Sequence, residues 1–445
     1  MRAKSLTLLL LLLMMLGPGA RAAEPPLARM EEVIQSYVAT KLFMGTVLIA
    51  RDNDIILDKA YGSADLEWNI PNTPATKFRI GSVTKQFTAA SVLLLEERGK
   101  LKLDDPIGKH LANLPAAWHK ATIAQILNHT SGIYSYTSLP GGEFMRWRHD
   151  QVIDRIKDKP LDFAPGEKYN YSNTGYFVLG MLIEKLSGQS YAQFLQDNIF
   201  TPLKMTDSGY DTEAAIIPQR AKGYERRNGA LVNSQFLDMT IPFSAGSLYS
   251  TTRDLLTWNR ALFAGKVVSP ASFKKMTTPG KDNYGFGLSV MPQDGHRAIF
   301  HGGGINGFTS SLATFPGDGL TVIVLNNAMG PTGDIASKLA ALMFGKTVTL
   351  ASERKEVVVD AKILARYVGR YELRPNFVLE ITQEGNALMT QAAKQQKIAI
   401  FAENDSNFFA RAIDAQITFV AEGEGPASAL VLHQAGRDIT AKRIP

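Results

Sequence analysis

The sequence predicts an α/β protein of the α+β type, in which helices flank an antiparallel sheet, followed by a small all-β domain. Strand-like segments occur at both ends of residues 23–348, and the part between them has helical periodicity. One sheet built from distant segments, with helices packed on it, would explain this order. Beyond residue 360 short alternating segments replace the helical pattern.

The N-terminus has the layout of a cleaved signal peptide. Arg2 and Lys4 precede an apolar run over residues 6–16, and a small-residue site ends at Ala22. The run is shorter than the ~20 residues that a membrane span needs. We therefore expect removal of residues 1–22 and a periplasmic or secreted protein without a membrane span.

Composition argues against several kinds of site. The chain has no cysteine, which excludes disulfides, a thiol nucleophile and thiolate metal sites. Without the basic residues of the signal peptide the formal charge falls from +6 to +3, too little to indicate nucleic-acid binding. No two of the seven histidines have the four-residue spacing of a helical zinc site. We expect no metal and no cofactor, and a small-molecule or peptide substrate.

The elements of the first domain follow from periodicity. An opening helix is expected over residues 30–43, and two strands joined by a polar turn over Gly45–Ala50 and Asp54–Ala60. Further helices are expected over Phe87–Arg98, Gly175–Leu186, Asp254–Phe263 and Thr332–Phe344. Further strands are expected over Ala298–His301, Phe308–Phe315 and Leu320–Asn326. This catalytic domain is expected to span residues 23–348.

The last part of the chain has a different pattern. A polar, charged stretch predicts a linker over residues 349–359. Residues 360–445 are expected to form a small β-barrel-like domain, because alternating segments separated by turn residues occur at Phe377–Thr382, Ala387–Thr390 and Ile417–Val420.

Ser82 and Lys85 lie three residues apart at the start of an apolar helix, so one helical face would carry both side chains. Gly81 precedes them, and a helix N-terminus favours a developing oxyanion. The spacing alone is weak, because it recurs at Ser272–Lys275 and Ser352–Lys355. A simple helix cap would also explain the serine.

Two further motifs follow in order. Tyr171 and Asn173 form a Y-x-N set 89 residues after Ser82, and the segment 301–303 reads His-Gly-Gly 130 residues after Tyr171. With these three motifs the chain resembles the serine β-lactamase and penicillin-binding protein superfamily, whose pattern is S-x-x-K, then Y-x-N, then K-T-G or H-x-G. The resemblance covers residues 30 to about 345.

The resemblance implies a role for each motif residue. Ser82 would be the nucleophile that carries the acyl group, with Lys85 or Tyr171 as its general base. Lysine at its usual pKa is charged, so burial or the positive end of the helix must lower the pKa of Lys85.

The remaining motif residues are expected to bind substrate. Asn173 resembles the residue that holds the substrate amide, although it could instead cap the next helix. His301 and Gly303 belong to the third motif, and the backbone N–H groups of Ser82 and Gly304 would bind the oxyanion.

The expected function is a serine hydrolase that cleaves ester or amide bonds, such as esters and D-amino-acid peptides or amides. Class C β-lactamases, D-aminopeptidases and family VIII carboxylesterases are similar. A true β-lactamase or D,D-carboxypeptidase is one alternative. Such enzymes have a lysine in the third motif where this chain has His301, which argues against this alternative. Neutral histidine weakens attraction to a substrate carboxylate by about 1 to 4 kcal/mol. An inactive penicillin-binding sensor is a second alternative, and the oligomeric state stays open.

Two other patterns are discounted. The glycines of residues 302–307 spell G-x-G-x-x-G, but a strand pattern follows them, which argues against dinucleotide binding. His129 and His149 could form a second catalytic pair, but His129 lies in a small-residue turn and is expected to be structural.

Overall fold

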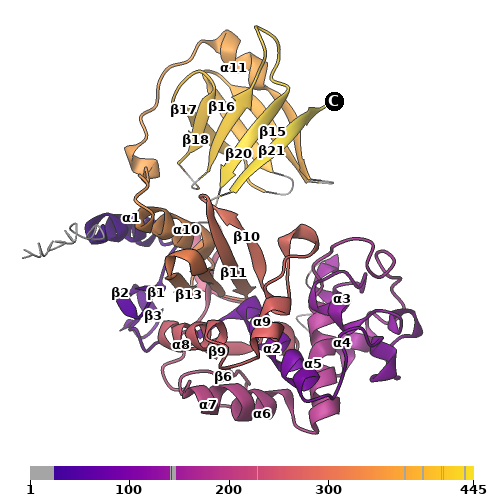
Figure 1. Cartoon of the computed structure of the whole chain (residues 1–445). Helices are drawn as coiled ribbons and strands as arrows, with labels where there is room; N and C mark the ends of the chain where they lie inside the picture. The colour runs from indigo at the N-terminus through magenta and orange to yellow at the C-terminus, as the bar shows by residue number, and fades with distance from the viewer. Residues whose placement is uncertain are drawn as a thin grey trace, which may run out of the picture.

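The computed structural model contains a mixed α/β part and a C-terminal β-barrel (Figure 1). The predicted signal peptide, residues 1–22, lies outside the described residues. The structure describes residues 25–140, 142, 147–227, 229–374, 377–392, 395–411, 413, 415–434 and 437–445.

A six-stranded antiparallel sheet forms the centre of the first part, with strand order β10–β11–β12–β13–β1–β2. Its strands are β1 (Gly45–Arg51), β2 (Asp54–Tyr61), β10 (Ser289–Gln293), β11 (His296–Ile305), β12 (Phe308–Phe315) and β13 (Leu320–Asn326). Strand β1 pairs with β13, so that Val47 lies opposite Val324. The sheet therefore joins distant chain segments, which confirms the predicted fold class.

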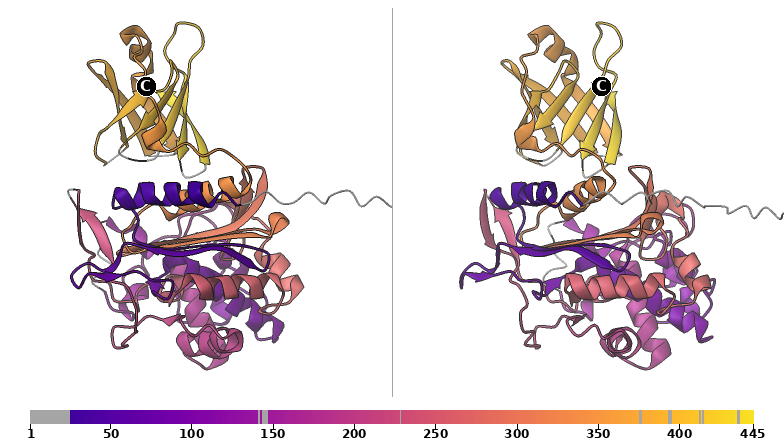
Figure 2. Two further views of the ribbon diagram at one scale, coloured as in Figure 1. Left: turned by 90° about the vertical axis from the view of Figure 1, so that its left-hand side faces the viewer. Right: turned by 60° about the vertical axis from the view of Figure 1, so that its left-hand side comes forward.

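Helices α1 (Leu27–Ala39) and α10 (Thr332–Met343) cover one face of the sheet (Figure 2). The buried residues of α1 recur every three or four positions and form one apolar stripe. Met30, Ile34 and Tyr37 belong to this stripe and pack in one core cluster with the sheet residue Val47. Leu350 belongs to the same cluster, so the beginning of the expected linker packs on the first part.

The other face of the sheet carries a larger, mainly helical layer. Its main helices are α2 (Thr84–Glu97), α5 (Asn173–Ser187) and α8 (Thr252–Phe263), which confirms three predicted helices. Phe87 of α2 stacks on Trp258 of α8 with ring centroids 4.0 Å apart. The indole Nε1 of Trp258 donates to Gln86 Oε1 at 3.0 Å, which satisfies the buried polar edge of the ring.

Shorter elements complete this part. The helices are α3 (Ile123–Leu127), α4 (Gln151–Asp154), α6 (Tyr191–Leu195), α7 (Thr201–Leu203) and α9 (Pro270–Met276). The small strands are β3 (Ser63–Asp65), β4 (Ile70–Pro71), β5 (Phe78–Arg79), β6 (Gly209–Tyr210), β7 (Tyr224–Arg227), β8 (Ala230–Asn233) and β9 (Leu248–Ser250). No described helix has the length and apolar character that crossing a membrane requires.

The C-terminal part is a closed antiparallel barrel in which β14 pairs with β21. Its strands are β14 (Gly369–Arg374), β15 (Phe377–Glu384), β16 (Ala387–Ala392), β17 (Ile398–Ala402), β18 (Asn407–Ala410), β19 (Gln416–Val420), β20 (Ala429–Gln434) and β21 (Arg437–Ile444). The prediction missed helix α11 (Ala361–Tyr367), which Asp360 caps. Leu364 and Tyr367 of this helix pack into the barrel core, and Tyr367 stacks on Phe419 at 4.2 Å.

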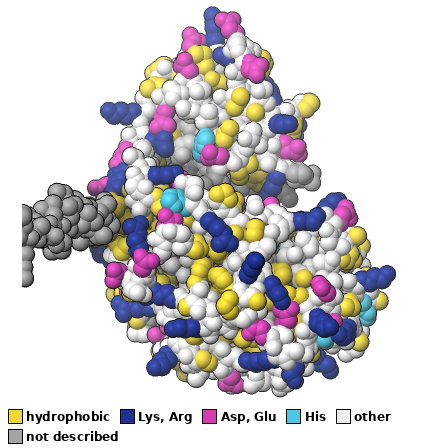
Figure 3. Space-filling model, viewed as in Figure 1, with side chains coloured by type: hydrophobic (Ala, Val, Ile, Leu, Met, Phe, Trp, Pro, Cys, Tyr) yellow, Lys and Arg dark blue, Asp and Glu magenta, His cyan; other side chains and the backbone are white. Residues whose placement is uncertain are grey.

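The barrel lies over the layer of α1 and α10 (Figures 1 and 2). Two consecutive residues of the connecting segment contact different parts of the molecule. Glu353 accepts from Arg29 of α1 at 2.6 Å, whereas Arg354 pairs with Glu403 of the barrel at 2.6 Å. Acidic and basic side chains are interspersed over both parts in the face that Figure 3 shows.

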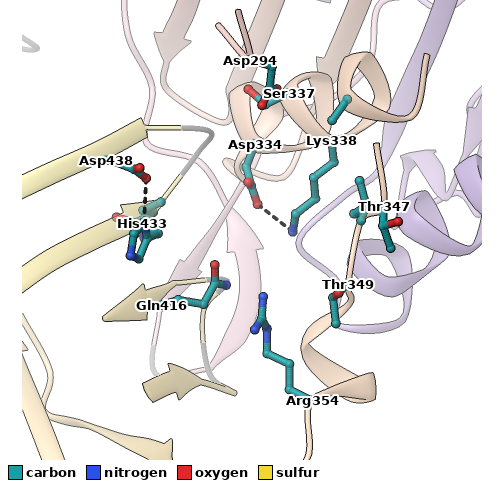
Figure 4. A pocket seen from close by; sticks show the side chains of 13 residues that line it. Asp294, Asp334, Ser337, Lys338, Thr347, Thr349, Arg354, Gln416, His433 and Asp438 are labelled. Carbon is teal, nitrogen blue, oxygen red and sulfur yellow. Dashed lines mark hydrogen bonds and ion pairs between the residues drawn. The ribbon is translucent and has the colours of Figure 1, made fainter. Parts of the chain in front are cut away.

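A cavity of about 290 Å³ lies between the two parts. Charged side chains from α10 and from the barrel project into it (Figure 4). Lys338 lies 3.4 Å from Asp334, and His433 lies 2.7 Å from Asp438. The cavity is therefore lined by paired acidic and basic side chains.

Candidate active site

Ser82 lies in a 3₁₀ turn, Gly81–Val83, directly before α2. The N-cap residue of α2 is Val83, which makes no side-chain cap bond, so the serine hydroxyl is not used for capping. Gly81 has a φ of 50°, and a Cβ there would lie 2.9 Å from the backbone N of Gly304. The serine turn and strand β11 therefore meet backbone to backbone, which only glycine permits.

Gly303 makes a second close approach to this turn. A Cβ at this position would lie 2.0 Å from the carbonyl oxygen of Ile80. The Ser310 hydroxyl donates to the same oxygen at 2.7 Å. Gly303 thus packs against the turn, whereas Gly304 lines a pocket together with Ser82.

Lys85 is fully buried, and its Nζ contacts three oxygen atoms. It lies 3.0 Å from Ser82 Oγ, 2.8 Å from Asn173 Oδ1 and 2.8 Å from the carbonyl oxygen of Ala245. Burial lowers the pKa of Lys85 well below its usual range. A neutral amine donates its two hydrogens to the two carbonyl-type oxygens, which leaves its lone pair facing the serine hydroxyl.

Asn173 is held by its own set of hydrogen bonds. Its Nδ2 donates to Thr137 Oγ1 at 2.9 Å, which turns Oδ1 toward Lys85. Ser172, and not Asn173, caps helix α5 by accepting from Gly175 N at 3.2 Å. The capping alternative for the asparagine is therefore wrong.

Tyr171 is the second side chain, after Lys85, that lies beside Ser82. Its phenol interacts with Ser82, and its ring centroid lies 4.8 Å from Lys85 Nζ. Burial raises the pKa of Tyr171 above its usual value, so the phenol stays protonated at neutral pH. Both candidate bases thus contact the serine, one as an amine with a lowered pKa and one as a phenol with a raised pKa.

His301 is buried, and both ring nitrogens have protein partners. Its Nδ1 lies 2.5 Å from the carbonyl oxygen of Gly302, and its Nε2 lies 2.9 Å from the Tyr284 hydroxyl. A carbonyl only accepts, which assigns the proton to Nδ1 and makes Nε2 the acceptor. Burial, with the nearby Lys85, lowers the pKa of His301 to about 3. The ring is therefore neutral, and neither nitrogen is open to a substrate.

Tyr284 belongs to none of the three motifs, and His129 was expected to be structural, yet both lie beside the motif residues. His129 Nδ1 accepts from the backbone N of Ser172 at 3.1 Å, and its ring lies 4.2 Å from that of Tyr171. His149 donates to the Thr240 carbonyl at 2.8 Å, and no described interaction joins the two histidines. Their proposed catalytic pairing therefore has no support.

A pocket of about 120 Å³ adjoins the serine. None of its described lining residues carries a formal charge, and all lie between Ser82 and Asn306, so the barrel contributes none. The lining combines apolar and polar side chains: Leu237, Ile241, Pro242, Ala245, Ile305 and Tyr136, with Thr137, Asn173 and Asn306. Within the described residues, no cluster of three or more histidines and acids is arranged for a metal ion.

Two family models match the chain. The model described as Beta-lactamase matches residues 30–343, and the Domain of unknown function (DUF3471) matches residues 353–443. Penicillin-binding protein 4* of Bacillus subtilis (strain 168) is 29% identical over 436 residues, 90% of this chain and 95% of the relative. A teichoic acid D-alanine hydrolase of Staphylococcus aureus is 31% identical over 270 residues, 58% of this chain and 65% of the relative.

A solved structure has the same architecture over nearly the whole chain. The octameric penicillin-binding protein homologue from Pyrococcus abyssi superposes with a TM-score of 0.67 and 26% identity. The match covers 94% of this chain and 100% of that chain. Because the Beta-lactamase model spans residues 30–343, with Ser82, Asn173 and His301 inside it, this chain belongs to the beta-lactamase family.

Proposed function

We propose that this chain is a serine hydrolase that cleaves esters of short, uncharged acyl groups through an acyl-enzyme on Ser82. One observation carries the proposal. Lys85 is buried, its described hydrogen-bond partners include no carboxylate, and its Nζ lies 3.0 Å from Ser82 Oγ beside an uncharged pocket. This arrangement supplies a neutral base, a nucleophile and an acyl site together.

The acylation step uses the amine and two backbone groups. Lys85 Nζ accepts the proton of Ser82 while Oγ attacks the ester carbonyl. The backbone N–H groups of Ser82 and Gly304 support the resulting oxyanion, because both residues line the pocket. Asn173 keeps Lys85 in place through its bond of 2.8 Å to Nζ.

Departure of the alcohol needs a proton donor. Tyr171 remains protonated and interacts with Ser82, and its ring centroid lies 4.8 Å from Lys85 Nζ. It is therefore suited to donate to the leaving oxygen and to recover a proton from the Lys85 ammonium. Water then attacks the acyl-enzyme, with the same groups acting in reverse. Lys85 serves as the resting base, and Tyr171 serves as the proton carrier.

The pocket limits the acyl group. Its volume of about 120 Å³ is small beside the roughly 300–1,000 Å³ of sites for larger ligands. Its wall at Leu237, Ile241 and Ile305 is apolar and favours short hydrocarbon chains.

D-Amino-acyl esters or amides are a second candidate. The similarity to a teichoic acid D-alanine hydrolase supports this class. Such substrates carry an ammonium group, and the described pocket offers it amide and hydroxyl oxygens but no carboxylate. Simple esters therefore rank first.

A substrate panel tests the proposal with the full mature chain. We expect kcat/KM for p-nitrophenyl butyrate to exceed the values for D-alanine p-nitroanilide and for nitrocefin, by about tenfold or more for nitrocefin. Preference of the wild type for nitrocefin would contradict the proposal. Covalent labelling without turnover of any substrate would support the sensor instead.

A further inference from the structure

Tyr284 lies in a loop with a constrained backbone. Asp282 and Asn283, directly before it, both have positive φ, at 54° and 57°. Side chains other than glycine rarely adopt this region, and surrounding contacts must hold it. Gly280 N donates to the Tyr284 carbonyl at 2.9 Å and closes the loop around the two strained residues.

The same loop packs on the helix turn that carries the candidate base. Gly287 has a φ of 69°, and a Cβ there would lie 2.5 Å from the carbonyl oxygen of Lys85. Gly285 N donates to the Leu288 carbonyl at 2.8 Å and sets this turn. The loop with Tyr284 is therefore fixed relative to helix α2.

The Tyr284 ring occupies the centre of an aromatic cluster behind the site. Ring centroids lie 4.7 Å away for His129, 5.9 Å for Tyr169, 6.2 Å for Tyr171 and 5.7 Å for His301. Tyr284 is 2% exposed, so its hydroxyl is shielded from bulk solvent. Its O–H donates to His301 Nε2 at 2.9 Å.

This bond adds to the Gly302 carbonyl in fixing the His301 ring and its tautomer against strand β11. With Nε2 occupied as an acceptor, the ring proton stays on Nδ1 and bonds the Gly302 carbonyl at 2.5 Å. Gly302 lies two residues before Gly304, and a Cβ at Gly81 of the serine turn would lie 2.9 Å from the backbone N of Gly304. The chain of bonds thus runs from the Tyr284 hydroxyl to the backbone that carries the second oxyanion donor.

We propose that Tyr284 is a positioning residue, whose hydroxyl fixes the Nδ1-protonated tautomer of His301 and through it the oxyanion-binding backbone of β11. This inference rests on the proposed function for its kinetic test, and the tautomer itself can be measured without activity. Tyr284 acts through His301 and does not touch the substrate.

Tyr284→Phe removes only the hydroxyl, and Tyr169→Phe is the matched control from the same ring cluster. We expect Tyr284→Phe to lower kcat for p-nitrophenyl butyrate about tenfold with KM nearly unchanged, because the oxyanion forms only in the transition state. Tyr169→Phe should change kcat less than twofold. Equal effects of the two variants would overturn the proposal.

A double-mutant cycle separates positioning from general packing. His301→Asn preserves a donor near the Nδ1 position but has no atom at Nε2 to accept from Tyr284. In this background Tyr284→Phe should cost less than twofold, since its target is gone. An undiminished tenfold loss there would show that the tyrosine acts by another route.

Nitrogen-15 NMR of the histidine rings reads the tautomer directly, with His301→Asn identifying the His301 signal. Wild type and Tyr169→Phe should show a proton on Nδ1 alone, and Tyr284→Phe should show a second tautomer or exchange. The groups that face the His301–Tyr284 pair are Lys85 of α2, His129, Tyr169, Tyr171 and Tyr176. An unchanged His301 signal in Tyr284→Phe would reject the proposal even if no ester were cleaved.

Discussion

Two lysines of this protein have opposite surroundings. Lys85 is fully buried against an amide oxygen, a carbonyl oxygen and a hydroxyl. Lys338, beside the cavity between the domains, lies 3.4 Å from the Asp334 carboxylate and 2.7 Å from the Tyr37 hydroxyl. Burial lowers the pKa of both lysines, but only at Lys338 does a carboxylate oppose that shift. Under the proposed function, burial without a neighbouring carboxylate is what would let Lys85 act as a base.

Ser82→Ala removes the atom on which the neutral lysine acts, and has the largest expected effect. We expect kcat for p-nitrophenyl butyrate to fall by about 10⁴-fold or more, and covalent labelling by a fluorophosphonate to disappear. Ser272→Ala is the control, because Ser272 has the same spacing to a lysine but lies in α9. Labelling that survives in Ser82→Ala would reject the nucleophile.

Asn173→Asp would give Lys85 the kind of partner that Lys338 has. A carboxylate 2.8 Å from Nζ favours the ammonium and raises the pKa of Lys85. The base works when neutral, so activity is lost as pH falls through that pKa, and the acidic limb should move to higher pH. We expect kcat/KM at pH 7 to fall about 100-fold and to recover partly in alkaline buffer. A pH series of kcat/KM measures both effects.

Asn173→Ala is the control for the carboxylate that Asn173→Asp adds. It removes the hydrogen bond to Lys85 without adding a carboxylate, so its acidic limb should stay at the wild-type pH although its activity is lower. If the two variants shift the acidic limb equally, the added charge does not govern Lys85.

Asp334→Asn makes the converse change at Lys338. The carboxylate accepts from the Tyr37 hydroxyl at 2.5 Å and pairs with Lys338, and both partners are largely buried. We expect the free energy of unfolding to fall by about 1–3 kcal/mol, because a buried donor loses a charged acceptor. Activity should change less than twofold. Urea unfolding and ester kinetics on the same samples test this separation, and a large loss of kcat with full stability would contradict it.

Removal of the barrel should have the smallest effect on chemistry. A chain ending at Glu353 keeps Leu350 in its core cluster and keeps the bond from Arg29 to Glu353. Every described lining residue of the pocket beside the serine lies between Ser82 and Asn306. We expect the shortened protein to fold and kcat/KM for p-nitrophenyl butyrate to change less than threefold. A soluble, folded product with no activity would show that the barrel acts on the site.

The sequence predicted the sheet and the main helices because their apolar periodicity is long and regular. Helix α11 has seven residues and was missed, since so short a pattern is hidden among alternating strands. Asp360, which caps this helix, was the available signal.

The motif residues were predicted because the order and spacing within their motifs are fixed. Tyr284, which contacts a motif residue from another element, was not predicted. The Tyr284 bond to His301 joins two elements, and no spacing rule describes it. The glycines around the tyrosine, Gly280, Gly285 and Gly287, were the only local indication of a tight loop. His301 was expected to bind substrate, but it is buried and both of its ring nitrogens have protein partners.

The serine turn and β11 meet through backbone atoms, so the backbone sets the distance between Ser82 and Gly304, the proposed nucleophile and oxyanion donor. A Cβ at Gly303 would lie 2.0 Å from the carbonyl oxygen of Ile80, so this contact leaves no room for a side chain. The apolar wall of the pocket comes mainly from a separate segment, residues 237–242. Substrate range and catalytic geometry can therefore change independently during evolution, which makes that segment the natural target for library design.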